Sequence, residues 1–173
     1  MDANDSDSIV VCDAGPLIHL DEVGCLGLLS DFSRCLVPEA VWVEVERVRP
    51  TAMSQSGFVV EKVAVESTDF HDEVAVLSTS LSLHTGELAA LRLAKSTPHS
   101  LLLTDDTAAR LAARQLSVRV HGTIGILIRA IRRGQMSKEA VVETLRSLPS
   151  RSTLHLKRSL LAQIIEEVER VDS

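Results

Sequence analysis

Two apolar runs in this sequence each end in acidic residues. Residues 9–12 lead directly into Asp13, and residues 101–104 lead into Asp105 and Asp106. Each run is typical of a buried parallel strand that continues into a helix, and ligands bind at the carboxyl ends of such strands. Ionised carboxylates close to a core are costly unless they are paired, hydrogen-bonded or bound to a metal. The pattern therefore predicts a site for a hard cation, for which phosphodiester chemistry is a natural use.

Two glutamates extend this set. Glu44 shares one face of a predicted helix with Val41 and Val45, which favours a role on the core side. Alternatively, Glu44 lies at the edge of that apolar face and its carboxylate extends into solvent. Glu87 lies in the first turn of another predicted helix, where an acid is also common because it complements the helix dipole. Each glutamate taken alone therefore has a structural explanation.

The aspartates have structural alternatives as well. Asp13 fits an ordinary strand-to-helix turn, and Asp106 is well placed to cap a helix over residues 107–116. The doublet of Asp105 and Asp106 is harder to explain in this way, because adjacent carboxylates repel each other and capping needs only one. The joint placement is better evidence, since four separate segments each bring an acid to the same sheet edge. If the first and fourth strands are neighbours, this edge is a topological switch point.

The elements that must position these acids alternate between short strands and helices. This order predicts a three-layer α/β fold with a mostly parallel sheet. We expect strands at residues 8–13, 35–37, 58–65, 100–104 and 118–120. We expect helices at residues 16–20, 26–29, 38–48, 68–80, 86–95, 107–116, 123–133, 138–148 and 154–171. Thr85 and Ser137 are the expected caps of the helices that follow them, and Pro149 is expected beyond the end of its helix.

The expected domain organisation is simple. Residues 1–7 are predicted to be a disordered tail, residues 8–150 a single domain, and residues 151–173 a C-terminal helix. That helix carries Leu156, Leu160, Ile164 and Val168 at four-residue spacing. Such an apolar face packs either on the domain or on a partner.

The composition is that of a folded chain with an acidic surface. The 173 residues are 45% hydrophobic but only 2% aromatic, with no tyrosine, which argues against single-strand binding by stacked aromatic residues. The net charge of -6 excludes a chain that is basic as a whole, but not a nucleic-acid enzyme with metal ions and local basic clusters. Arg110, which follows the acidic doublet by one helical turn, is the best candidate for such a contact. Arg129, Arg132 and Arg133 cluster at the end of another predicted helix, where they either contact substrate phosphates or lie on a solvated face and complement the helix dipole.

Cysteines and termini indicate the compartment. Cys12, Cys25 and Cys35 are odd in number and lack CxxC spacing, so we expect small core residues in a reducing environment. The acidic N-terminus has no following apolar stretch of a signal peptide, and no apolar run reaches the ~20 residues of a membrane span. We therefore expect a cytoplasmic protein. The six histidines have no zinc-site spacing and are predicted to be surface or loop residues.

Five short motifs resemble, in order, those of the PIN-domain family of metal-dependent ribonucleases. They are VVCDAGPLI at residues 10–18, VPEAV at 37–41 leading to Glu44, GELAAL at 86–91, LTDDTAAR at 103–110 and GTIGIL at 122–127. Each is short, but their order and spacing together are fairly specific. The chain is similar to VapC-type toxins, the nuclease halves of toxin–antitoxin pairs, or to a close prokaryotic relative.

The resemblance implies a sheet of order 3-2-1-4-5 and an acidic pocket for Mg²⁺ or Mn²⁺. The implied catalytic residues are Asp13, Glu44, Glu87 and Asp106, and the implied metal ligands are Asp13, Asp106, Glu87 and Asp105. Arg110 and Thr123 are the expected substrate contacts, although a role in capping a helix explains Thr123 equally well. Many PIN domains carry Asp where this chain has Glu87, and the added methylene would shift the metal. The resemblance also implies an RNA substrate, a homodimer, and an antitoxin protein that covers the pocket.

Three functions are consistent with an α/β domain of this kind. The first is a metal-dependent endoribonuclease, and the second is a non-catalytic PIN-like module that binds a protein or RNA. The complete acid set favours the first, because a binding module has no need for four mutually repelling carboxylates. The third is a phosphatase or receiver-like domain. Against it, the acids at residues 2, 5 and 7 precede the first strand, and no matching lysine follows a later one.

Overall fold

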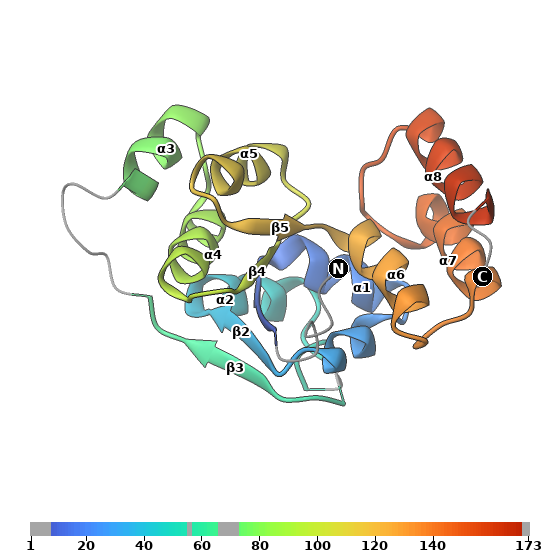
Figure 1. Ribbon diagram of the computed structural model, residues 1–173. Helices are drawn as coiled ribbons and strands as arrows, with labels where there is room; N and C mark the ends of the chain where they lie inside the picture. Colours follow the sequence, from blue (N-terminus) through green and yellow to red (C-terminus); the bar gives the residue numbers. More distant parts are fainter. Residues whose placement is uncertain (1–7, 55–56, 66–72, 171–173) are drawn as a thin grey trace.

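The computed structural model describes residues 8–54, 57–65 and 73–170, which form an α/β fold around a five-stranded parallel sheet (Figure 1). The strand order β3-β2-β1-β4-β5 confirms the expected order 3-2-1-4-5. The strands are β1 (Ile9–Cys12), β2 (Arg34–Pro38), β3 (Val60–Val63), β4 (Leu101–Leu103) and β5 (Arg119–His121). The expected disordered tail at residues 1–7 lies outside the described residues.

The first apolar run forms the centre of the sheet. Val10, Val11 and Cys12 have no exposed surface, as expected for a parallel strand covered on both faces. Strand β1 lies between β2 and β4, with Cys12 beside Leu103, and the N–H of Asp13 donates to the carbonyl of Leu103 at 2.9 Å. The acids that follow β1 and β4 therefore start from the same sheet edge, at the switch point of the topology.

Helices flank the sheet and lead from one strand to the next. They are α1 (Ala14–Glu22), the 3₁₀ helix η2 (Leu26–Asp31), α2 (Glu39–Val48), α3 (Glu73–Leu81), α4 (Thr85–Ser96), α5 (Thr107–Gln115), α6 (Thr123–Arg132), α7 (Lys138–Arg151) and α8 (Arg158–Arg170). Helix α4 packs against β1, β2 and β4, whereas α6 contacts α1 and α7, and α7 packs on α8. Figure 1 shows α3, α4 and α5 gathered at one side of the molecule and α6, α7 and α8 at the other.

Helix α4 begins one residue earlier than expected. Its cap is His84, which has an extended backbone conformation, and Thr85 is already helical. The backbone N–H of His84 donates to Oε2 of Glu87 at 2.8 Å, so the helix start is fixed by a capping box rather than by a threonine hydroxyl. The expectation that Thr85 caps this helix is therefore wrong.

The C-terminal part of the chain differs from the predicted boundaries in two places. Pro149 lies inside α7, because the helix continues to Arg151 and the carbonyl of Leu148 accepts the N–H of Ser152 at 2.9 Å. Helix α8 begins at Arg158 rather than near residue 154, so Leu156 lies in the connecting segment outside the helix. The physical reason is that Ser152 and Thr153 hydrogen-bond to a side chain of α1 instead of starting a helix.

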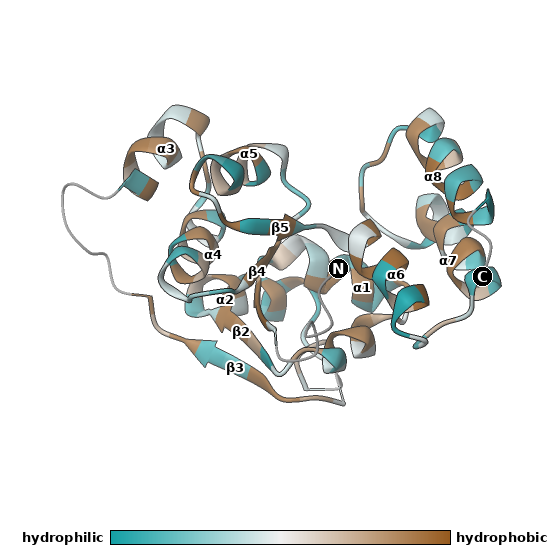
Figure 2. Ribbon diagram, viewed as in Figure 1, coloured by the Kyte–Doolittle hydropathy of each residue, from teal (hydrophilic) through white to brown (hydrophobic). Residues whose placement is uncertain are grey.

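The core is aliphatic, as the composition predicts. Its largest fully buried side chains are leucines, isoleucine and valine, and Figure 2 shows hydrophobic colouring along β4 and alternating character along α8. All three cysteines are buried and free, with the sulfurs of Cys12 and Cys35 3.5 Å apart on adjacent strands. Within the described residues, no helix combines the length and apolar character needed to cross a membrane.

Candidate active site

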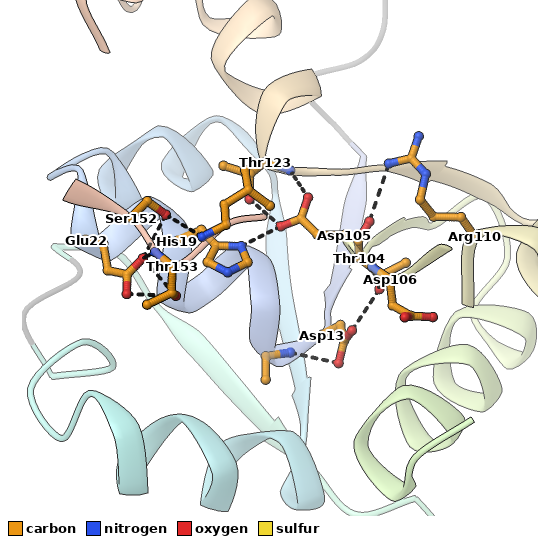
Figure 3. Close-up of polar contacts among 12 residues, drawn as sticks. Asp13, His19, Glu22, Thr104, Asp105, Asp106, Arg110, Thr123, Ser152 and Thr153 are labelled. Atoms are coloured by element: carbon orange, nitrogen blue, oxygen red, sulfur yellow. Dashed lines mark hydrogen bonds and ion pairs between the residues drawn. The ribbon is translucent and has the colours of Figure 1, made fainter. Parts of the chain in front are cut away.

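Asp13 follows β1 and caps the start of α1. Its Oδ1 accepts the backbone N–H of Ala14 at 2.8 Å, and its Oδ2 accepts the hydroxyl of Thr104 at 2.8 Å (Figure 3). Burial raises the pKa of Asp13 to about 6, because it outweighs the lowering effect of these two hydrogen bonds and is reinforced by the charges of Glu87 and Glu44. Asp13 is therefore a helix cap and also one of three mutually repelling carboxylates.

Thr104 connects the ends of the two central strands. Its hydroxyl donates to Asp13, and the same oxygen accepts the backbone N–H of Asp106 at 3.2 Å. Asp106 in turn caps α5, since its Oδ1 accepts the N–H of Ala109 at 2.7 Å, which confirms the predicted cap. Sequence reasoning missed Thr104. The available signal was a hydroxyl residue between a buried strand and an acidic doublet.

Asp105 points to a different set of partners from Asp106. Its Oδ1 accepts the N–H of Thr123 at 2.8 Å, and its Oδ2 accepts the Thr123 hydroxyl at 2.6 Å and Nδ1 of His19 at 2.8 Å (Figure 3). Burial raises the pKa of Asp105, but the hydrogen bonds from His19 and Thr123 outweigh it and hold the pKa below its ordinary value. The structure thus separates the doublet into a helix cap and a carboxylate that orients a histidine.

Two side chains in this cluster differ from expectation. Thr123 is fully buried, its hydroxyl donates to Asp105, and it is not among the residues that line the pocket. His19, predicted to be a surface or loop residue, lies on α1 with a side chain only 14% exposed and a carboxylate partner. Sequence reasoning missed His19 because its partner is distant in the chain.

The two glutamates reach the site from α2 and α4. Glu44 is largely exposed, yet its Oε2 lies only 3.2 Å from the point where a Cβ on Gly86 would stand, and Oδ1 of Asp13 lies 4.0 Å from the same point. The missing side chain at Gly86 therefore leaves room for the two carboxylates. The carboxylate of Glu87 turns back to the start of its own helix, where it accepts the N–H of His84.

These residues surround one pocket of about 360 Å³ at the carboxyl edge of the sheet. All four predicted catalytic residues and Asp105 line it. The described lining residues are Asp13, Ala14, Gly15, His19, Glu44, His84, Glu87, Asp105, Asp106, Thr153, Leu154 and His155. The structure thus brings the predicted carboxylates together and adds three histidines and a C-terminal segment.

Comparison with known families agrees with this geometry. A family model described as a PIN domain matches residues 9–170, nearly the whole chain. The chain belongs to the PIN-domain family. PIN domains are generally metal-dependent nucleases, so membership supports a nuclease-type function for the pocket. No curated protein matches the chain at a significant level.

The donor set of this PIN domain fits a hard divalent cation. Carboxylate oxygens are the ligands that Mg²⁺ and Mn²⁺ prefer, and a Cβ at Gly86 would fill the space beside Asp13 and Glu44. In the part of the chain that the structure describes, no group of three or more histidines, cysteines or acids is already arranged to hold a metal ion. The carboxylate of Glu87 is engaged with the backbone of His84.

Two arginines that the sequence singles out have different surroundings in the structure. Nη1 of Arg110 lies 3.5 Å from the carbonyl of Thr104, beside the acidic doublet, although Arg110 does not line the pocket itself. Arg129 is buried, stacks over Phe32, and forms an ion pair with Asp31. Arg129 therefore has a structural role, while Arg110 lies beside the acidic doublet.

Proposed function

We propose that this PIN domain is an endoribonuclease that hydrolyses RNA phosphodiester bonds with Mg²⁺ or Mn²⁺. The observation that carries the proposal is the convergence of Asp13, Glu44, Glu87 and Asp106 on one pocket. A folded protein gains no stability from holding Asp13 buried among other acids, as its raised pKa indicates. A non-catalytic RNA- or protein-binding module, the alternative, offers no reason for this cost.

The four acids have distinct roles in this proposal. Asp13 and Asp106 are each fixed by hydrogen bonds to a helix start, and a carboxylate has enough lone pairs to cap a helix and bind a cation as well. They would hold the metal directly. Glu44 and Glu87 would hold it directly or through water. The bound cation would supply an activated water and stabilise negative charge on the scissile phosphate.

Asp105 has a smaller role in metal binding than the sequence suggests. Three hydrogen bonds from Thr123 and His19 engage its two oxygens. We therefore assign to Asp105 the orientation of His19, and keep direct metal binding for it only as the expectation of the family resemblance. Arg110 is proposed to meet the RNA backbone outside the pocket.

The toxin assignment rests on the resemblance to VapC-type proteins. We propose that the chain is the toxin of a toxin–antitoxin pair, acting on cytoplasmic RNA as a homodimer and inhibited by an antitoxin that covers the pocket. A gene for a small antitoxin-like protein beside this one would support the pairing.

The decisive experiment is a cleavage assay on total RNA with Mn²⁺. Wild-type protein should cleave RNA, excess EDTA should abolish cleavage, and Asp13→Asn should be inactive while its circular dichroism remains that of a folded protein. Glu46→Gln is the matched control, because Glu46 is exposed on α2 and does not line the pocket. Cleavage that survives EDTA would rule out the metal, and RNA binding without cleavage would favour the binding module.

A further inference from the structure

The segment between α7 and α8, residues 152–157, forms one wall of the carboxylate pocket. Thr153, Leu154 and His155 line the pocket together with residues from α1, α2 and α4. The C-terminal hairpin of α7 and α8 therefore contributes directly to the site.

Glu22, the last residue of α1, holds this segment in place. Its Oε2 accepts the hydroxyl of Ser152 at 2.8 Å and the N–H of Thr153 at 2.7 Å, and its Oε1 accepts the Thr153 hydroxyl at 3.0 Å (Figure 3). Burial raises the pKa of Glu22, but these hydrogen bonds outweigh it and hold the pKa below its ordinary value. The contact is therefore intact at neutral pH, and it fixes the backbone two residues before His155.

The pocket has an excess of negative charge. The described residues that line it include five carboxylates and three histidines, but no lysine or arginine. An RNA phosphate that enters is repelled by any carboxylate charge that a bound cation leaves uncompensated. N–H donors on the pocket wall are then the protein's own means of holding the RNA backbone, and an imidazole carries an N–H whether neutral or protonated.

Of the three histidines that line the pocket, His155 is the one whose ring has no carboxylate partner among the described residues. Nδ1 of His19 is bonded to Asp105, and Nδ1 of His84 lies 3.6 Å from Oε2 of Glu87. His155 is exposed, and within the described part of the chain no hydrogen bond or ion pair engages its ring.

We propose that His155 donates a hydrogen bond to an RNA backbone phosphate at the pocket, and that Glu22 is the positioning residue that holds His155 there. This inference rests on the ribonuclease function proposed above. It adds a substrate contact from outside the carboxylate set and assigns the C-terminal segment a part in substrate binding.

The test is the kinetics of His155→Ala on a short labelled RNA with Mn²⁺. We expect KM to rise about tenfold, the factor that one hydrogen bond to a charged group represents, and kcat to stay within about twofold of wild type. His155→Gln keeps an N–H donor and should recover most of the loss. Because His155 is exposed, both variants should melt at the wild-type temperature.

Lys157→Ala is the matched control for charge. It removes a full positive charge from the same segment at a residue that does not line the pocket, so its KM should equal that of wild type. An equal rise of KM in Lys157→Ala and His155→Ala would overturn the specific contact. An unchanged KM in His155→Ala, with wild type active, would overturn it as well.

Glu22→Ala tests the positioning role. Its KM should rise by a factor similar to that of His155→Ala, and the double variant should show no further rise, because Glu22 acts through His155. Additive effects in the double variant would overturn this role. If wild type cleaves no RNA, the proposed ribonuclease fails and this inference fails with it, whereas a failure of the inference alone leaves wild-type cleavage intact.

Discussion

At the residue scale, the surroundings of Asp13 oppose its negative charge. It is 6% exposed and lies near Glu44 and Glu87, and the hydrogen bonds from Thr104 and Ala14 only partly offset these effects. A bound cation would reverse the balance by attracting the same carboxylates that otherwise repel each other. The site is thus less favourable for the protein alone than for the protein with a divalent ion.

The raised pKa of Asp13 predicts a pH dependence of stability. The pKa of Asp13 is raised from 3.8 to about 6 in the folded protein. Between about pH 4 and pH 6, the folded protein therefore keeps the Asp13 proton, whereas the unfolded chain has already lost it. The contribution of this group to the free energy of unfolding should therefore decrease from about pH 4 to about pH 6, by on the order of 3 kcal/mol, and stay low above it. Urea unfolding in EDTA at pH 4–8 should show this decline for wild type and not for Asp13→Asn. Parallel profiles for the two proteins would contradict it.

Metal addition should raise the free energy of unfolding, because a cation compensates the charge of Asp13. At neutral pH, Mn²⁺ at one hundred times its dissociation constant should stabilise the wild type by about 2.7 kcal/mol, because the folded protein alone has the site. Asp13→Asn should gain much less, while Glu46→Gln should respond as wild type does. Thermal unfolding with and without EDTA measures the shift, and an equal gain in Asp13→Asn would exclude Asp13 as a ligand.

Thr104 allows a test of whether the hydrogen bonds between the ends of β1 and β4 support the metal site. Thr104→Val keeps the shape but removes the hydroxyl that bonds to Asp13 and to the N–H of Asp106. Loss of such an outer contact should reduce metal affinity or kcat by about 10–100-fold. Calorimetric titration with Mn²⁺ and steady-state cleavage measure the two effects. Thr79→Val, on the exposed part of α3, is the control and should change neither.

At the scale of elements, the junctions between strands and helices determine the site. Asp13 lies between β1 and α1, Asp106 lies between β4 and α5, and Gly122 lies between β5 and α6. A Cβ at Gly122 would stand 2.5 Å from Oδ1 of Asp105 and 2.8 Å from Nη1 of Arg110. The close approach of this junction to Asp105 therefore requires glycine.

Gly122→Ala should accordingly displace Asp105 and its histidine. We expect a loss of about 1–3 kcal/mol in the free energy of unfolding, the usual cost of overpacking, together with lower cleavage activity. Gly27→Ala is the control, since a Cβ there meets nothing within 4 Å, and its stability should stay near that of wild type. Denaturant unfolding compares the two variants. Equal stability of Gly122→Ala and Gly27→Ala would show that the β5–α6 junction accommodates a Cβ and would contradict the prediction.

At the scale of the whole molecule, the proposed homodimer is open to direct test. Size-exclusion chromatography with light scattering should give twice the mass of the 18.8 kDa chain. The same measurement over a range of protein concentrations distinguishes a stable dimer from weak association. A monomer at every concentration would contradict the proposal.

The sequence predicts most of the architecture because the signals are local. The apolar runs at residues 9–12 and 101–103 are buried strands, and the alternation of elements gives a parallel sheet. Sequence reasoning fails where a distant partner decides the local structure. Helix α8 begins later than its apolar spacing suggests, because Glu22 binds Ser152 and Thr153 and keeps that segment extended.

The sequence by itself indicated which acids lie together, since each follows a strand, opens a helix or shares the apolar face of one. Only the tertiary structure decided what each acid does. It turned Asp105 toward His19 and Thr123, left Asp106 at a helix cap beside Asp13, and brought His155 to the same pocket. The physical reason is that the hydrogen bonds and the charge interactions at the site are between residues far apart in the chain, and no local sequence pattern contains them.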